Sequence, residues 1–164
     1  MASVLEQLNA IRSAAGERLT AGLDDETVCQ FVSRDETLVE AVNLATKEFQ
    51  TLSDEFPELM KLGEVEQIAE IEGHLVNFYA DDTVNPYVSM AAYGPWIVTT
   101  KGAVLHDNGG YGMLGFGHVP ERIIDAMTKP QVMANVMTPS FSQLRLAEAL
   151  DREIGQEETQ VQLR

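Results

Sequence analysis

The sequence has 164 residues, with 26 acids against 11 bases, a formal net charge of −15 and a pI near 4.4. Its 45% of apolar residues is ordinary for a soluble globular protein, and its length fits one domain and is too short for a complete two-domain enzyme. The acidic charge argues against a nucleic-acid partner, since phosphate binding needs a basic surface, and no apolar run approaches the roughly 18 residues of a membrane span.

Charge and turn-forming residues divide the sequence into two parts. Residues 1–84 hold 18 acids and 5 bases, whereas residues 85–164 hold 8 acids and 6 bases together with most of the glycines and prolines. We therefore predict an acidic helical N-terminal extension over 1–84, a turn-rich segment over 85–155 and an atypical tail over 156–164. The first boundary should fall between Asp82 and Pro86.

The first part has the apolar spacing of amphipathic helices. Ser3-Val-Leu-Glu6 is a capping-box pattern that predicts a helix start, and further helices are expected over 25–32, after a cap at Asp35, from Pro57 and up to Gly73. The side chains that should line the buried faces are Leu5, Leu8, Ile11 and Ala15, then Leu38, Val42, Ala45, Phe49 and Leu52, and finally Val65, Ile68 and Ile71. These helices could form a partner-binding arm or a solvated outer face over a packed inner one. The second interpretation is favoured, because amphipathic helices are the usual surface element.

The second part begins with a predicted β-hairpin. Residues 96–100 and 103–105 have strand composition, and Lys101-Gly102 supplies the turn between them. A helix should begin at Pro120 and end at Lys129-Pro130, with Ile123, Ile124 and Met127 on its buried face. The capping pattern Ser140-x-x-Gln143 opens a last helix that should stop at Gly155. Its apolar side chains are Leu144, Leu146, Ala147, Leu150 and Ile154.

A glycine-rich segment between the hairpin and the first of these helices is the most informative stretch. It has five glycines among the nine residues 109–117, and Gly110-x-Gly112-x-x-Gly115 is the letter pattern of a dinucleotide loop. That pattern requires a parallel βαβ unit and an acid about 20 residues further on, whereas an antiparallel hairpin comes first here and residues 129–143 hold no acid. A loop pressed against a ligand or a second subunit explains the segment better, because bare backbone permits close approach.

The other reactive side chains form no recognisable catalytic or metal pattern. His74, His106 and His118 lack the i, i+4 spacing of a helical metal site, and His106-Asp107 are strand neighbours whose side chains point to opposite faces. Cys29 is the only cysteine, which excludes an intrachain disulfide and a cysteine-based zinc site. No signal peptide opens the sequence, so a reducing cytoplasm is the expected compartment.

Taken as one string, residues 101–120 resemble the start of a class III aminotransferase. These pyridoxal-phosphate (PLP) enzymes open with a Lys/Arg-Gly turn, a strand ending in Asp and a glycine-rich loop that closes on Gly-His-x-x-Pro. Here these elements are Lys101-Gly102, Asp107 and Gly117-His118-Val-Pro120, with one residue fewer before the proline than the family usually has. The helix that follows, a crossing segment like 132–141 and the Leu-Ala-x-x-Leu core of 146–150 appear in the family's order. The resemblance covers about residues 85–155.

The resemblance implies the N-terminal part of an α/β, fold type I PLP-transferase: an α+β fragment in which N-terminal helices precede a small β-hairpin and further helices. The family moves an amino group between an amine or amino acid and a keto acid, with PLP as the electron sink. Its phosphate loop and Schiff-base lysine are missing here, and Lys47, Lys61, Lys101 and Lys129 do not stand in the family's lysine context. We therefore assign no catalytic residue. We expect a fragment of a longer gene, truncated or frameshifted near codon 155 and inactive alone.

The resemblance also implies where substrate would lie. The glycine-rich loop and the crossing segment line the family's substrate pocket, so the candidate substrate-binding residues are Tyr111, Gly112, Met113, Asn135 and Met137. Family members are dimers with active sites at the subunit interface, which makes a homodimer the expectation for the full-length form. The isolated fragment would expose the apolar face of residues 144–154 and should self-associate. The alternatives are a non-enzymatic acidic helical interaction module and, third, a nucleotide-binding enzyme.

Overall fold

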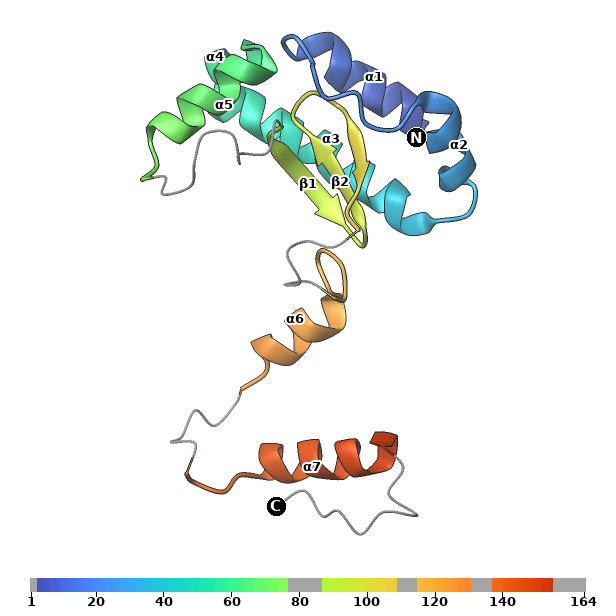
Figure 1. Cartoon of the computed structure of the whole chain (residues 1–164), viewed down its shortest axis with the longest axis vertical. Coiled ribbons are helices and arrows are strands. Elements are labelled where there is room, and N and C mark those ends of the chain that lie inside the picture. Colours follow the sequence, from blue (N-terminus) through green and yellow to red (C-terminus); the bar gives the residue numbers. More distant parts are fainter. Residues whose placement is uncertain (1–2, 77–86, 109–114, 131–136, 155–164) are drawn as a thin grey trace. The chain divides into compact units, whose positions relative to one another are not determined.

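The computed structural model describes residues 3–76, 87–108, 115–130 and 137–154 (Figure 1). The predicted boundary between Asp82 and Pro86, the stop at Gly155 and the tail 156–164 lie outside these residues. The chain forms two compact units, Met1–Ile124 and Asp125–Arg164, which we describe separately. The fold is mixed α+β, as predicted: the described residues contain seven α-helices and one three-stranded antiparallel sheet.

Local capping chemistry sets the starts of the first three helices, α1 (Val4–Ala14), α2 (Asp25–Val32) and α3 (Glu36–Glu55). The hydroxyl of Ser3 accepts a hydrogen bond from the backbone of Glu6, whose carboxylate accepts one from the Ser3 backbone, so the predicted capping box is confirmed. Asp24 caps α2 through Thr27 N, and Asp35 caps α3 through Thr37 N. A short helix, α4 (Pro57–Lys61), and α5 (Glu64–Gly73) follow.

The sheet has the order β1-β2-β3, with both pairs antiparallel. Its strands are β1 (Ser89–Tyr93), β2 (Trp96–Thr99) and β3 (Val104–His106). The pair β2–β3 confirms the predicted hairpin, and Gly102 at φ +70° supplies the left-handed residue of its turn. Strand β1 was not predicted from the sequence, and its ladder to β2 runs from Ser89 opposite Thr99 to Tyr93 opposite Trp96.

One hydrophobic core joins the helices to the sheet. It contains α1 and α3 residues such as Leu8, Leu38 and Val42 together with the strand residues Val98 and Val104, each fully buried. Figure 1 shows α3 running along β1 and β2. The packed inner face predicted for the acidic helices is therefore confirmed, and the core includes residues on both sides of the compositional shift at 82–86.

Helix α5 corrects one predicted face. Val65 is 57% exposed, whereas Glu64 and Gln67 are buried. Oε2 of Glu64 accepts hydrogen bonds from Leu19 N at 2.8 Å and Thr20 N at 2.7 Å. Gln67 accepts one from the Thr100 hydroxyl at 2.6 Å and donates to Leu59 O at 3.1 Å. Burying a polar group is costly without a partner, and these bonds give partners to Gln67 and to one carboxylate oxygen of Glu64 on the inward face of α5.

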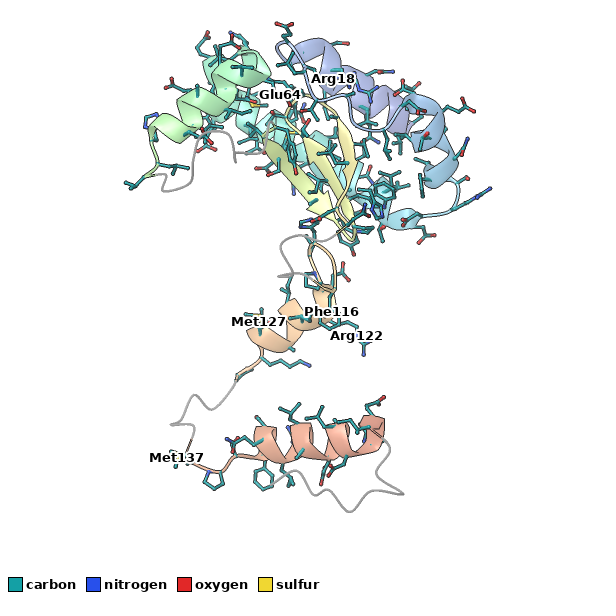
Figure 2. All side chains as sticks on the ribbon, viewed as in Figure 1. Arg18, Glu64, Phe116, Arg122, Met127 and Met137 are labelled. Atoms are coloured by element: carbon teal, nitrogen blue, oxygen red, sulfur yellow. The ribbon has the colours of Figure 1, made fainter. Side chains whose placement is uncertain are left out.

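The last two helices, α6 (Glu121–Thr128) and α7 (Phe141–Ile154), form with exposed apolar side chains. The predicted burial of Ile123, Ile124 and Met127 is wrong, since these side chains are 37%, 42% and 77% exposed. Met127 is labelled on α6 in Figure 2. Apolar periodicity identifies the face of a helix but not the element that covers it. On α7 the Ser140–Gln143 capping box is present, and Leu146 and Ile154 are more than half exposed. None of the described helices is both long and apolar enough to cross a membrane.

Candidate functional site

The two ends of the glycine-rich segment are joined to each other and to the sheet. Asp107 follows β3, and its Oδ2 lies 3.1 Å from Nε2 of His118 at the far end of the segment. The Asp107 backbone donates to Pro95 O at 2.7 Å. His118 and Gly94 exchange two backbone hydrogen bonds, at 2.7 and 3.0 Å. The segment is therefore closed at its base against the turn between β1 and β2.

This closure depends on glycine at two facing positions. Gly94 and Gly117 have φ angles of +54° and +77°, in the left-handed region. A Cβ on Gly117 would lie 2.8 Å from the carbonyl oxygen of Gly94. Val119, two residues later, is a β-branched residue at φ +50°. Such strained residues persist only where surrounding contacts hold them, and they cluster at ligand sites.

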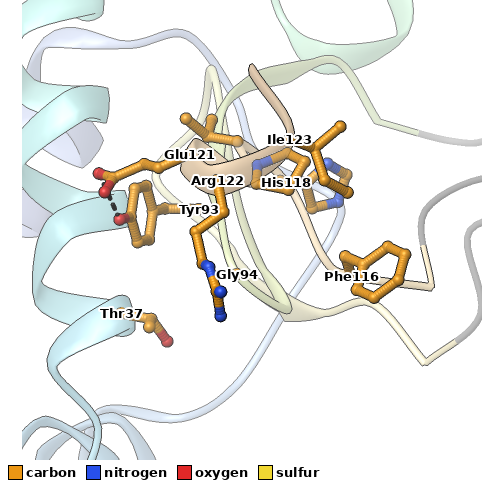
Figure 3. A pocket seen from close by; sticks show the side chains of 10 residues that line it. Thr37, Tyr93, Gly94, Phe116, His118, Glu121, Arg122 and Ile123 are labelled. Carbon is orange, nitrogen blue, oxygen red and sulfur yellow. Dashed lines mark hydrogen bonds between the residues drawn. The ribbon is translucent and has the colours of Figure 1, made fainter. Parts of the chain in front are cut away.

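A pocket of about 320 Å³ lies beside this junction (Figure 3). Thr37 of α3, Tyr93 and Gly94 line one side of it, and residues 116 and 118–123 line the other. The Tyr93 hydroxyl donates a hydrogen bond to Oε1 of Glu121 at 2.8 Å. This hydrogen bond, with burial and the negative charge of Glu121, raises the pKa of Tyr93. Within the described residues, Arg122 makes no hydrogen bond or ion pair, and Figure 3 shows its side chain extending toward Gly94 and Thr37.

A partly buried polar contact fixes the Thr37 side of the pocket. Asp35 accepts hydrogen bonds from the Thr37 backbone at 2.9 Å and from Nε1 of Trp96 at 2.8 Å. Burial raises the pKa of Asp35, but the hydrogen bonds from Thr37 and Trp96 outweigh that effect and hold the pKa below its usual value. The ring of His106 packs edge-on against Trp96, and its Nδ1 lies 2.6 Å from Oδ1 of Asn108. His106 and Asp107 thus bind different partners, as strand geometry predicts.

Only one of the substrate-binding residues predicted from the resemblance lies in the part of the chain that the structure describes, so their arrangement stays a prediction. Tyr111, Gly112, Met113 and Asn135 lie outside that part, and Met137, which is described, is 86% exposed in the second unit.

The sequence analysis missed Thr37, Tyr93, Glu121 and Arg122 as pocket residues. Thr37 and Tyr93 meet through tertiary packing and left no local signal. Glu121 and Arg122, adjacent opposite charges directly after Pro120, were visible in the sequence and could have indicated the α6 side of the pocket.

The described lysines do not fit a covalently held PLP. Lys101 is 1% exposed, and its Nζ donates to Leu62 O at 2.5 Å and to Met60 O at 3.4 Å. Burial lowers its pKa, an effect that the negative charges of Glu64 and Glu66 oppose. Lys101 thus anchors the β2–β3 turn to the end of α4, and no lysine lines the pocket. We accordingly derive no chemical step through the cofactor.

Comparison with known proteins adds no identification. No protein-family model matches the chain, and no curated protein or solved structure matches it either. Among the described residues, no group of three or more His, Cys, Asp or Glu side chains is arranged to hold a metal ion. The functional proposals below therefore rest on the motifs and geometry of this chain alone.

Proposed function

We propose that this chain forms the N-terminal segment of a class III PLP-dependent aminotransferase. The observation that carries the proposal is the contact between Asp107 and His118 at 3.1 Å. These residues are the two motif positions that flank the glycine-rich loop in the family, and their contact closes that loop in this chain. The Lys101-Gly102 turn ahead of them has the left-handed glycine that a tight hairpin turn requires.

The proposal gives this chain a substrate-lining role and assigns it no catalytic residue. Tyr111, Gly112 and Met113 would line the substrate pocket from the loop, and Asn135 and Met137 from the crossing segment. Asp107, His118 and Gly94 would hold the base of the loop. The cofactor, when bound in such enzymes, supplies an electron sink for amino transfer between an amine or amino acid and a keto acid. A homodimer of the full-length form is part of the same proposal.

The encoding DNA tests this proposal directly. It should be sequenced well past codon 155 and translated in all three frames. A Ser-Gly-rich phosphate loop followed by a lysine in the family's context is the expected result. The proposal would be overturned if none of the three frames contained the phosphate loop or the lysine. Steady-state transamination by the purified chain with added PLP would overturn the assignment of a purely substrate-lining role.

The second candidate is a non-enzymatic interaction module, in which the exposed apolar side chains of α7 would bind a protein partner. Leu144, Leu146 and Ile154 are 50%, 61% and 63% exposed, which is unusual for a helix with a continuous apolar stripe. A stable chain that is monomeric and ignores PLP would favour this candidate. Sedimentation of the purified chain separates the two, because the aminotransferase fragment should self-associate, whereas the module should stay monomeric.

A further inference from the structure

The pocket beside the glycine junction combines opposite charges on adjacent residues. Glu121 and Arg122 are consecutive at the start of α6, and both line the pocket. The Tyr93 hydroxyl holds one carboxylate oxygen of Glu121 at 2.8 Å, which fixes the negative group at one side. A carboxylate has acceptor capacity beyond a single donor. Glu121 can therefore receive a second, cationic donor without losing Tyr93.

Arg122 supplies the positive group of the pair. In Figure 3 its side chain runs away from Glu121 toward Gly94 and Thr37. It makes no hydrogen bond or ion pair with the residues that the structure describes, although Glu121 is its neighbour in the chain. A guanidinium presents a planar fork of donors that matches a carboxylate in a bidentate pair. An unpaired Arg122 at a pocket wall is therefore suited to a ligand carboxylate.

The pocket wall also carries large apolar side chains, beside the polar Thr37 and His118. Phe116 is 81% exposed, Val119 42% and Ile123 37%, and all three line the pocket. Large exposed apolar side chains that gather at a cavity indicate a binding site more strongly than single ones scattered over a surface. A volume of about 320 Å³ lies at the lower end of the range for small-molecule sites. It suits a ligand of amino-acid size and is small for a dinucleotide.

We propose that this pocket binds an α-amino acid with an apolar side chain, in its zwitterionic form. The ligand carboxylate pairs with Arg122, its ammonium group with Glu121, and its side chain packs against Phe116 and Ile123. A dicarboxylate would bring its second negative charge toward Glu121, and a simple amine would leave Arg122 unpaired. The inference goes beyond the proposed function, because it uses only the described pocket and holds for either candidate.

The test is calorimetric titration of the full chain with L-phenylalanine, without PLP. Phenylethylamine and 3-phenylpropionate, which lack the carboxylate and the amino group respectively, are the matched probes. We expect saturable binding of phenylalanine and affinities about tenfold or more weaker for both analogues, since each loses one charge-assisted hydrogen-bond pair. Absence of saturable phenylalanine binding, or equal affinity for the three probes, would overturn the proposal.

Two variants locate the binding site. Arg122→Gln removes the charge from an exposed side chain and should weaken phenylalanine binding about tenfold, with a smaller effect on phenylethylamine. Arg18→Gln, at an exposed arginine outside the pocket, is the matched control and should bind as wild type. Unchanged binding by Arg122→Gln, or an equal loss in both variants, contradicts the assignment. Because the titration contains no cofactor, its outcome is independent of the DNA test of the aminotransferase proposal.

Discussion

Replacing Gly117 by alanine tests whether close backbone approach holds the base of the glycine-rich segment. Gly117 has φ +77°, and an added Cβ would lie 2.8, 2.9 and 3.0 Å from the O, C and Cα atoms of Gly94. These are backbone atoms that cannot rotate away. A left-handed conformation costs a non-glycine residue about 1–2 kcal/mol, and overpacking adds typically ~1–3 kcal/mol. We expect the free energy of unfolding to fall by about 3 kcal/mol.

The assay is urea unfolding followed by the fluorescence of Trp96. This is the only tryptophan, it is 1% exposed, and it belongs to the core next to the Gly94 turn. Gly115→Ala is the control, two residues earlier, because a Cβ there meets no atom of the described residues within 4 Å and its φ is not positive. That variant should stay within about 0.5 kcal/mol of wild type. Equal unfolding midpoints for the two alanine variants would refute the reasoning.

Three further changes test caps and buried hydrogen bonds. Ser3→Ala removes the capping box of α1 and should lower the unfolding free energy by about 1 kcal/mol; a wild-type value in urea unfolding would contradict the cap. Asp35 has a lowered pKa because hydrogen bonds from Thr37 and Trp96 outweigh its burial. The ionised Asp35 therefore stabilises the folded chain fully above the unfolded pKa of about 3.9, and this contribution is lost as the pH falls through the lower folded pKa. Asp35→Asn should therefore be less stable than wild type at about pH 7 and lose less on acidification, and a constant difference between the two unfolding profiles would be inconsistent with this linkage. Gln67→Leu leaves the buried Thr100 hydroxyl and the partly buried Leu59 carbonyl without their partner and should cost about 1–3 kcal/mol in thermal or urea unfolding. A wild-type stability would show that the hydrogen bond to Thr100 contributes nothing.

Sequence patterns predicted the elements that depend on neighbours within a few residues. The cap at Asp35 and the turn at Gly102 are set by contacts close in the chain, and both are confirmed. Strand β1 was missed because Ser89-Met-Ala-Ala-Tyr93 contains few residues that favour strands. It forms because β2 offers a ladder on that side. The resemblance to class III aminotransferases stays a prediction.

The candidate site was harder to predict, because it is assembled from distant segments. Thr37 and Tyr93 reach the same pocket only after α3 packs along β1, and no single-sequence pattern contains that information. The inward turn of Glu64 has the same origin, since its partners Leu19 and Thr20 lie more than 40 residues earlier. Hydrophobic periodicity identifies the apolar face of a helix. It cannot predict the burial of a carboxylate whose hydrogen-bond partners lie far away in the sequence.

The shared core also has a consequence for synthesis on the ribosome. Nε of Arg12 in α1 donates to Gly102 O, across 90 residues of sequence. At about 5–20 residues per second, the first partner is made about 5–20 s before the second. During that interval the nascent helices carry apolar surface that the later strands will help to cover. Residues 1–84 contain 18 acids against 5 bases, so this segment of one nascent chain should repel the same segment of a neighbouring one. This repulsion would oppose association of the nascent chains while the core is incomplete.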